Sequence, residues 1–202
     1  MQWWCQMNKY MKMRSTGIPD GEFIRGDVPM TKSEVRSVIL SKLKIIEGNQ
    51  ICEIGAGSGS VSVELARLTS KGIVYSLEKN PEAVELIKKN IRKFEIDNIK
   101  LIEGEAPESL LEIPQMDRIF IGGSGGNMKE IIRWSYETLK SGGIVAASTI
   151  TIENNYTALK TFESMGFKNI EVVQILVSKT SKVGRVNMMK ALNPINIISA
   201  ER

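Results

Sequence analysis

The 202-residue sequence contains no histidine and only two cysteines. Without histidine, a His-ligated zinc site, a Ser-His-Asp triad and acid–base catalysis by imidazole are excluded. Cys5 and Cys52 are too few for a disulfide framework, and Cys52 lies in an apolar run typical of a protein core. We therefore expect a cytoplasmic protein in a reducing environment, with no bound metal.

Long apolar runs are also missing. No window approaches the roughly 18 apolar residues of a membrane-spanning helix, and Asn8, Lys9 and Lys12 interrupt the N-terminal region. With 42% hydrophobic and 25% charged residues, the composition is that of an ordinary globular protein. We predict one domain over residues 17–202, a poorly ordered extension over residues 1–16, and no membrane partner.

The net charge of +4 is concentrated at the two ends of the chain, around a slightly acidic middle. Two interpretations remain open at this point. The basic ends are either an ordinary solvated surface or a site for an anionic partner.

Short apolar runs alternate with amphipathic helical patterns along the chain. This alternation predicts an α/β fold with a parallel sheet, whose ligand site lies at the carboxyl ends of the strands. Two β-rich runs, Ile170–Val177 and Val186–Ile198, are predicted to close the sheet as an antiparallel hairpin joined by the basic stretch 179–185. The predicted strands are residues 50–54, 73–77, 99–102, 117–121 and 144–147, and the predicted helices include residues 61–68, 128–139 and 153–165.

Two helix starts carry capping signals. Asn80 precedes Pro81, which is the pattern of an N-cap followed by proline in the first turn. Thr31 and Glu34 have the spacing of a capping box, in which the threonine hydroxyl accepts from the amide at Glu34.

The strongest chemical signal is a glycine-rich loop between a strand and a helix. It reads Glu53-Ile-Gly-Ala-Gly-Ser-Gly-Ser60. Glycines permit a tight turn and let a ligand approach the backbone. Glu78 ends the next strand, where a carboxylate can accept hydrogen bonds from ribose hydroxyls.

Three interpretations of this loop compete. It is a purely structural turn, a dinucleotide site, or a site for S-adenosylmethionine. A dinucleotide site usually has the form G-x-G-x-x-G, whereas this loop is G-x-G-x-G with Glu53 two residues before its first glycine. An acid suits the ammonium group of S-adenosylmethionine better than a pyrophosphate, so we favour the methyl donor.

These features resemble a known family. The acid-x-G-x-G-x-G pattern, Glu78, and the pair Glu105-Ala106 after the third strand resemble the class I S-adenosylmethionine-dependent methyltransferases. Residues 18–25 and 28–36, the loop over 55–62, and Gly122–Gly126 resemble the cobalt-precorrin C15-methyltransferases (decarboxylating). The resemblance runs from about residue 18 to residue 194, and residues 179–185 are less rich in arginine than that family's pattern.

The resemblance implies a Rossmann-like fold with a seven-stranded, mostly parallel sheet, an antiparallel C-terminal hairpin and helices on both faces. It also implies S-adenosylmethionine as cofactor, a homotetramer, and a tetrapyrrole (corrinoid) substrate of cobalamin biosynthesis. The expected reaction methylates C15 of cobalt-precorrin-6B and removes the C12 acetate carboxyl group as carbon dioxide. The cofactor-binding residues expected are Thr31, Glu53, Gly55, Ala56, Gly57, Ser58, Gly59, Glu78, Glu105 and Ala106.

Candidates for substrate binding are a glycine-rich segment and several bases. The segment offers a backbone platform for a flat substrate, and the bases are candidates for carboxylate contacts. No general base is assigned, because a conjugated tetrapyrrole supplies its own nucleophilic carbon. The candidates are Gly122, Gly123, Ser124, Gly125 and Gly126, with Arg25, Arg185, Lys179 and Lys182.

The alternative functions are methylation of RNA or protein and a binding module without catalysis. Methylation of exocyclic amines in nucleic acids usually shows an Asn/Asp-Pro-Pro-aromatic segment after the fourth strand, where this chain has Gly122-Gly123-Ser124. Neither cysteine lies where pyrimidine C5 methylation needs a nucleophile. We therefore expect no nucleic-acid partner.

Overall fold

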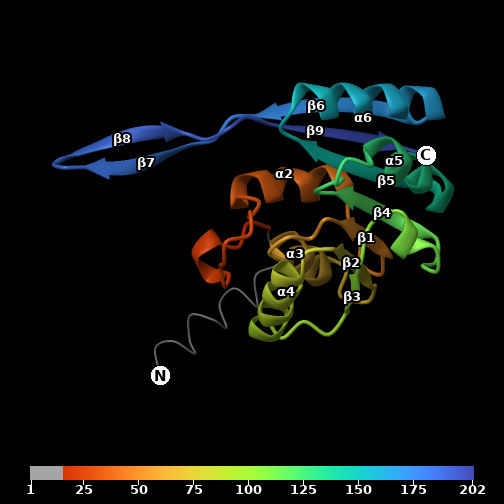
Figure 1. Cartoon of the computed structure of the whole chain (residues 1–202), viewed down its shortest axis with the longest axis horizontal. Coiled ribbons are helices and arrows are strands. Elements are labelled where there is room, and N and C mark those ends of the chain that lie inside the picture. The colour runs from red at the N-terminus through yellow and green to blue at the C-terminus, as the bar shows by residue number, and fades with distance from the viewer. Residues whose placement is uncertain (1–15) are drawn as a thin grey trace.

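The computed structural model describes residues 16–202 and is built around one seven-stranded sheet (Figure 1). The strand order is β3-β2-β1-β4-β5-β9-β6, and β9 runs in the direction opposite to the other six strands of this sheet. The mostly parallel sheet predicted from the sequence is confirmed. The strands are β1 (Ile51–Ile54), β2 (Val74–Glu78), β3 (Ile99–Glu103), β4 (Met116–Ile121), β5 (Leu139–Thr149), β6 (Lys168–Ile175) and β9 (Ile195–Glu201).

Helices cover both faces of the sheet, as predicted. One face carries α2 (Ser33–Leu43), α3 (Ser60–Leu68) and α4 (Pro81–Lys93), and the other carries α5 (Met128–Thr138) and α6 (Ile152–Met165). Two short 3-10 turns, Asp20–Glu22 and Glu108–Leu110, complete the helical elements. In the described part of the chain, no helix is long and apolar enough to cross a membrane.

The apolar strands are explained by burial on both sides. Ile51 and Phe120 pack toward α2 and α3, whereas their chain neighbours Cys52 and Ile119 pack toward α5 and α6. Adjacent side chains in a strand point to opposite faces, so a strand covered on both sides reads as a continuous apolar run.

One of the two capping predictions is confirmed and the other is wrong. The Asn80 side chain accepts from the N–H groups of Glu82 (2.9 Å) and Ala83 (3.4 Å). At α2, however, no side chain of the predicted box caps the helix, which begins at Ser33. Asp20 Oδ1 accepts from the Ser33 N–H at 2.9 Å, so a residue from outside the local sequence takes the capping role.

The C-terminal region differs from the predicted two-strand hairpin by one inserted element. Between β6 and β9 the chain forms a separate antiparallel pair, β7 (Ser178–Val183) and β8 (Val186–Ala191), which turns at residues 184–185. The basic stretch 179–185 is therefore strand and turn rather than a connecting loop. Figure 1 shows this β7–β8 hairpin projecting away from the rest of the molecule.

Residues 17–32, here called the N-terminal strap, are held by a buried ion network. Arg36 of α2 is fully buried and pairs with Asp20 (2.9 Å) and Glu64 (2.7 Å). It also donates to the carbonyl groups of Ile18 and Thr31. The network joins the strap to α2 and α3.

A second anchor connects the strap to the glycine loop. Asn90 of α4 exchanges hydrogen bonds with the backbone N–H and C=O of Ile24 and donates to the Ser58 carbonyl at 2.9 Å. On the other side, Lys179 at the base of the hairpin pairs with Glu34 at 3.0 Å. The strap, the glycine loop and the hairpin base thus lie around one region.

Candidate active site

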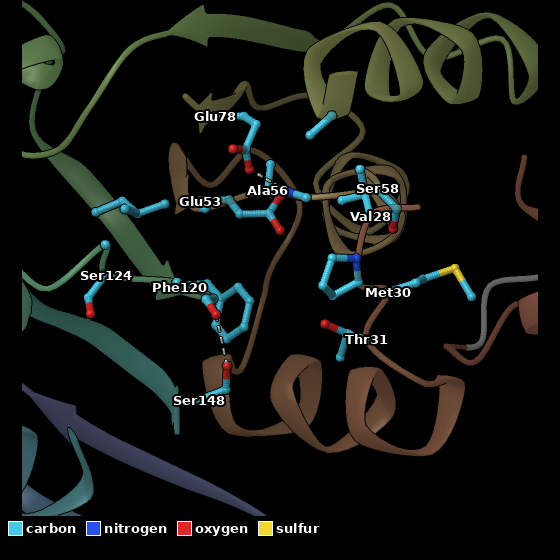
Figure 2. Close-up of a pocket in the computed structure, with 18 of the residues that line it drawn as sticks. Val28, Met30, Thr31, Glu53, Ala56, Ser58, Glu78, Phe120, Ser124 and Ser148 are labelled. Carbon is cyan, nitrogen blue, oxygen red and sulfur yellow. Dashed lines mark hydrogen bonds between the residues drawn. The ribbon is translucent and has the colours of Figure 1, made fainter. Parts of the chain in front are cut away.

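A cavity of about 670 Å³ lies at the carboxyl ends of the parallel strands (Figure 2). It lies at the ends of β1 and β4, the neighbouring strands at which the strand order reverses direction: β2 and β3 follow on one side of β1, and β5 follows on the other side of β4. Such a switch point is where open α/β sheets bind ligands. The N-terminal strap covers one side of the cavity, and the hairpin base contributes Val177, Leu192 and Asn193 to its wall.

The glycine loop forms the floor of this cavity through backbone contacts. Gly55 and Gly57 have φ angles of 74° and 56°, in the left-handed region. A Cβ on Gly55 would lie 2.7 Å from the amide nitrogen of Gly123, in the segment that follows β4. The two segments can approach this closely only because neither has a side chain at the contact.

Glu78 fastens the loop to the end of β2. Its Oε2 accepts from the Gly57 N–H at 2.8 Å, and its Oε1 accepts from the N–H groups of Lys79 and Asn80 at 2.9 Å. A carboxylate has about four acceptor positions, so one remains for a ligand hydroxyl. Glu78 lines the cavity, as expected for a ribose contact.

Glu53 lies almost completely buried in the wall of the same cavity, with 1% of its surface exposed. Burial raises the pKa of this carboxyl group to about 8, the hydrogen bond from Ser62 lowers it, and the nearby charge of Glu78 raises it further. In the free protein at neutral pH, Glu53 is therefore mostly protonated. A cationic ligand would favour its ionised form.

Two further features lie in the part of the cavity wall that includes Glu78 and the glycine loop. Glu105 pairs with Lys79 at 2.8 Å, and both side chains line the cavity beside Ala106. The Ser58 hydroxyl is buried without a hydrogen-bond partner in the described part of the chain. A buried polar group of this kind, facing a cavity, is completed by a bound ligand or water.

The structure brings most of the predicted cofactor residues together. Thr31 lines the cavity opposite Glu78, with Glu53 between them (Figure 2). Gly59 does not line it; this residue precedes α3 with a φ angle of 75° and packs on Ile87. The cofactor candidates that line the cavity are Thr31, Glu53, Gly55, Ala56, Gly57, Ser58, Glu78, Glu105 and Ala106.

The predicted substrate residues divide into two groups. Gly122, Gly123, Ser124 and Gly125 line the cavity, whereas Gly126 does not. The basic candidates also lie outside the cavity of a single chain. Arg25 is exposed on the strap, Arg185 is exposed at the hairpin turn, Lys179 is paired with Glu34, and Lys182 is exposed on β7.

Several cavity residues were missed by the sequence analysis. Ser148 and Thr149 end β5, so the rule that ligands bind at strand ends would have found them. Asn154 of α6 and Lys32 carry no such signal. The hairpin base was also unpredictable, because its place depends on how β6 and β9 pair.

The sheet order with reversed β9 is that of the class I methyltransferase fold, which solved structures of methyltransferases share. Residues 22–202 match the family model described as a precorrin methyltransferase domain. The chain therefore belongs to the precorrin methyltransferase family.

Individual relatives are similar over nearly the whole chain. A probable cobalt-precorrin-6B C(15)-methyltransferase (decarboxylating) from Sulfolobus acidocaldarius is 43% identical over 94% of this chain and 100% of its own length. The crystal structure of precorrin-6y C5,15-methyltransferase from Geobacter metallireducens has a TM-score of 0.87 and 39% identity, covering 93% of this chain and 98% of its own. The structure of precorrin 8w decarboxylase from Methanobacterium thermoautotrophicum has a TM-score of 0.85 and 33% identity, covering 92% of this chain and 100% of its own.

Proposed function

We propose that this protein is a cobalt-precorrin-6B C15-methyltransferase (decarboxylating) of cobalamin biosynthesis. It transfers a methyl group from S-adenosylmethionine to C15 and removes carbon dioxide from the C12 acetate side chain. The observation that carries the proposal is the match to the Sulfolobus protein along that protein's entire length, at 43% identity. All the loops that form the cavity lie within the matched family region.

The residues at the acidic end of the cavity fit S-adenosylmethionine. The free acceptor position of Glu78 suits a ribose hydroxyl, and the buried carboxyl group of Glu53 suits the ammonium group. The cofactor supplies an activated methyl group. The chain's own contribution is to hold the donor and the ring carbon in line, which by itself supplies much of the rate of a displacement reaction.

The test is incubation of the protein with cobalt-precorrin-6B and S-adenosylmethionine, followed by mass spectrometry of the corrinoid. The proposal expects a product that has gained a methyl group and lost carbon dioxide. An unchanged corrinoid, with labelled methyl appearing instead in added RNA or protein, would contradict it and support the alternative substrate classes.

Replacing Glu78 by alanine should weaken S-adenosylmethionine binding by about 1.5–3 kcal/mol, the value of hydrogen bonds to a charged group. The variant loses the ribose contact and also leaves the N–H groups of Gly57, Lys79 and Asn80 without their acceptor. Isothermal titration calorimetry measures the change, with Glu82→Ala on the exposed side of α4 as control. Equal dissociation constants for the two variants would place the ribose contact elsewhere.

Donor binding should release a proton from Glu53 at neutral pH. The free carboxyl group has a pKa of about 8 and is mostly protonated, whereas the cationic donor favours the ionised form and so lowers that pKa. Between the lowered pKa and about 8, affinity should therefore rise with pH, and above about 8 this contribution should level off. Calorimetry at pH 7 in buffers of different ionisation enthalpy counts the proton. Glu53→Gln should abolish its release; equal release in both proteins would contradict the assignment.

We also propose that the chain assembles as a homotetramer through the β7–β8 hairpin. Every residue of β8 is exposed, and the hairpin presents Val183, Val186, Met188 and Met189 to solvent. Such apolar surface on paired strands is typical of a protein interface. Association would also bring Arg185 and Lys182 toward neighbouring subunits. Light scattering with gel filtration tests this, and full activity at the monomer mass of 22.5 kDa would contradict it.

A further inference from the structure

The two ends of the cavity differ in charge. The carboxyl groups of Glu53, Glu78 and Glu105 gather at the donor end. Lys32, Ser148, Thr149 and Asn154 also line the cavity. Figure 2 shows Thr31, the residue before Lys32, and Ser148, the residue before Thr149, on the side opposite Glu78. The end lined by Lys32 therefore suits a ligand group of opposite charge, a carboxylate.

Lys32 is the cavity lysine that makes no ion pair with any residue of the described range 16–202. The other lysine of the cavity, Lys79, pairs with Glu105. Lys32 has no ion pair or side-chain hydrogen bond within residues 16–202, although two acids lie near it in the fold. Both acids are held in other ion pairs: Asp20 with Arg36 and Lys179, and Glu34 with Lys179. An ammonium group left unpaired at a cavity wall is available to an anionic ligand.

A second, independent observation comes from Thr149, the last residue of β5. It is 3% exposed and lines the cavity, and its hydroxyl group has no hydrogen-bond partner among residues 16–202. Leaving a buried hydroxyl group unpaired costs about 1–3 kcal/mol. A polar group of a ligand would remove this cost.

The walls between these polar groups are apolar. The apolar residues that line the cavity are Val35 of α2, Phe120 of β4, Val177 and Leu192 at the hairpin base, and Ile195 of β9. Such a surface suits the face of a flat conjugated ring, whereas Lys32 and Thr149 suit the polar groups at the rim of that ring.

We propose that this end of the cavity is the acceptor subsite. The Lys32 ammonium group binds a side-chain carboxylate of the corrinoid, and the Thr149 hydroxyl group hydrogen-bonds a second polar group of the same molecule. The proposal rests on the proposed function, because that function makes the substrate a tetrapyrrole with several carboxylates. The carboxylate contact is thereby made by a residue of the cavity wall itself. The bases that the sequence suggested for this contact all lie outside the cavity of a single chain.

The test is the kinetics of Lys32→Gln with cobalt-precorrin-6B. We expect its KM for the corrinoid to rise about tenfold or more, the effect of losing one charge-assisted hydrogen bond. The dissociation constant for S-adenosylmethionine should change by less than about twofold. Lys32→Arg should restore most of the affinity, and Lys89→Gln, on the exposed face of α4, is the matched control. A raised dissociation constant for the donor with an unchanged corrinoid KM would overturn the assignment.

Thr149→Val separates a substrate contact from a structural role. Removing an unpaired buried hydroxyl group should leave the melting temperature unchanged or higher, while the corrinoid KM rises about fivefold or more. Thr149→Ser keeps a hydroxyl group and should retain the lower KM. A fall in melting temperature with an unchanged KM would show that the hydroxyl group serves the fold alone.

A binding measurement keeps this test separate from the test of the proposed function. Uroporphyrin, a tetrapyrrole with eight carboxylates, serves as the probe, and its fluorescence reports binding. Wild-type protein that binds uroporphyrin but does not convert cobalt-precorrin-6B would contradict the proposed function alone. Equal uroporphyrin affinity for Lys32→Gln and Lys89→Gln would overturn the subsite, whatever the activity. No binding of either tetrapyrrole to the wild-type protein would overturn both.

Discussion

Replacing Arg36 by methionine should lower the free energy of unfolding by about 3–5 kcal/mol, the cost of breaking a buried ion pair. Arg36 is fully buried, and Glu64, its partner at 2.7 Å, has a side chain only 3% exposed. Removing the guanidinium group leaves that carboxylate buried without its counter-charge. It also releases Asp20 and the carbonyl groups of Ile18 and Thr31, so the strap loses its main anchor. Urea denaturation measures the loss.

A matched control lies on the same helix. Lys42 pairs with Glu171 at 2.7 Å, but both side chains are partly or largely exposed. Lys42→Met should therefore cost about 0–1 kcal/mol, as exposed ion pairs do. Adding Glu64→Gln to Arg36→Met should recover part of the loss, because the unpaired charge of Glu64 is then removed as well. Equal losses for Arg36→Met and Lys42→Met would contradict the importance of the buried network.

Replacing Gly55 by alanine should raise the dissociation constant for S-adenosylmethionine by roughly a hundredfold or more. The added Cβ would lie 2.7–2.9 Å from the N, O and Cα atoms of Gly123. Backbone atoms held at the end of β4 cannot move aside as a flexible side chain would. The φ angle of 74° adds about 1–2 kcal/mol of strain for any L-residue. The donor loop and the segment after β4 must therefore separate, which disrupts both walls of the site.

A companion substitution tests a different contact of the same loop. A Cβ on Gly57 would lie 3.3 Å from the Pro29 carbonyl oxygen and 3.9 Å from Val28, so Gly57→Val meets the strap as well as the space above the loop. We expect donor binding to be lost while the circular dichroism spectrum is kept. Gly21→Ala is the control for both variants, because no atom of residues 16–202 lies within 4 Å of its added Cβ. Donor affinity unchanged in Gly55→Ala would contradict the proposed position of the donor.

The sequence by itself determined the order of the helices and of the strands as far as β6, and much of the donor end of the cavity. The strands of the sheet are apolar runs because they are buried on both faces, and Asn80 caps α4 through contacts two and three residues away. The glycine loop and Glu78 were predictable for a similar reason. Their role depends on the backbone conformation of the loop and on a position at the end of a strand, and a few adjacent residues determine both.

Only the tertiary structure decided the features that depend on residues far apart in the chain. The cap of α2 comes from Asp20 rather than Thr31, because the buried Arg36 draws the strap against that helix. The β7–β8 hairpin takes the basic stretch away from the cavity, so Arg185 lies at its turn instead. The place of Lys32 in the cavity wall, directly before α2, follows from the packing of that helix beside β4, β5 and β9. Local patterns record backbone preference and burial, whereas these contacts are set by how separate elements pack.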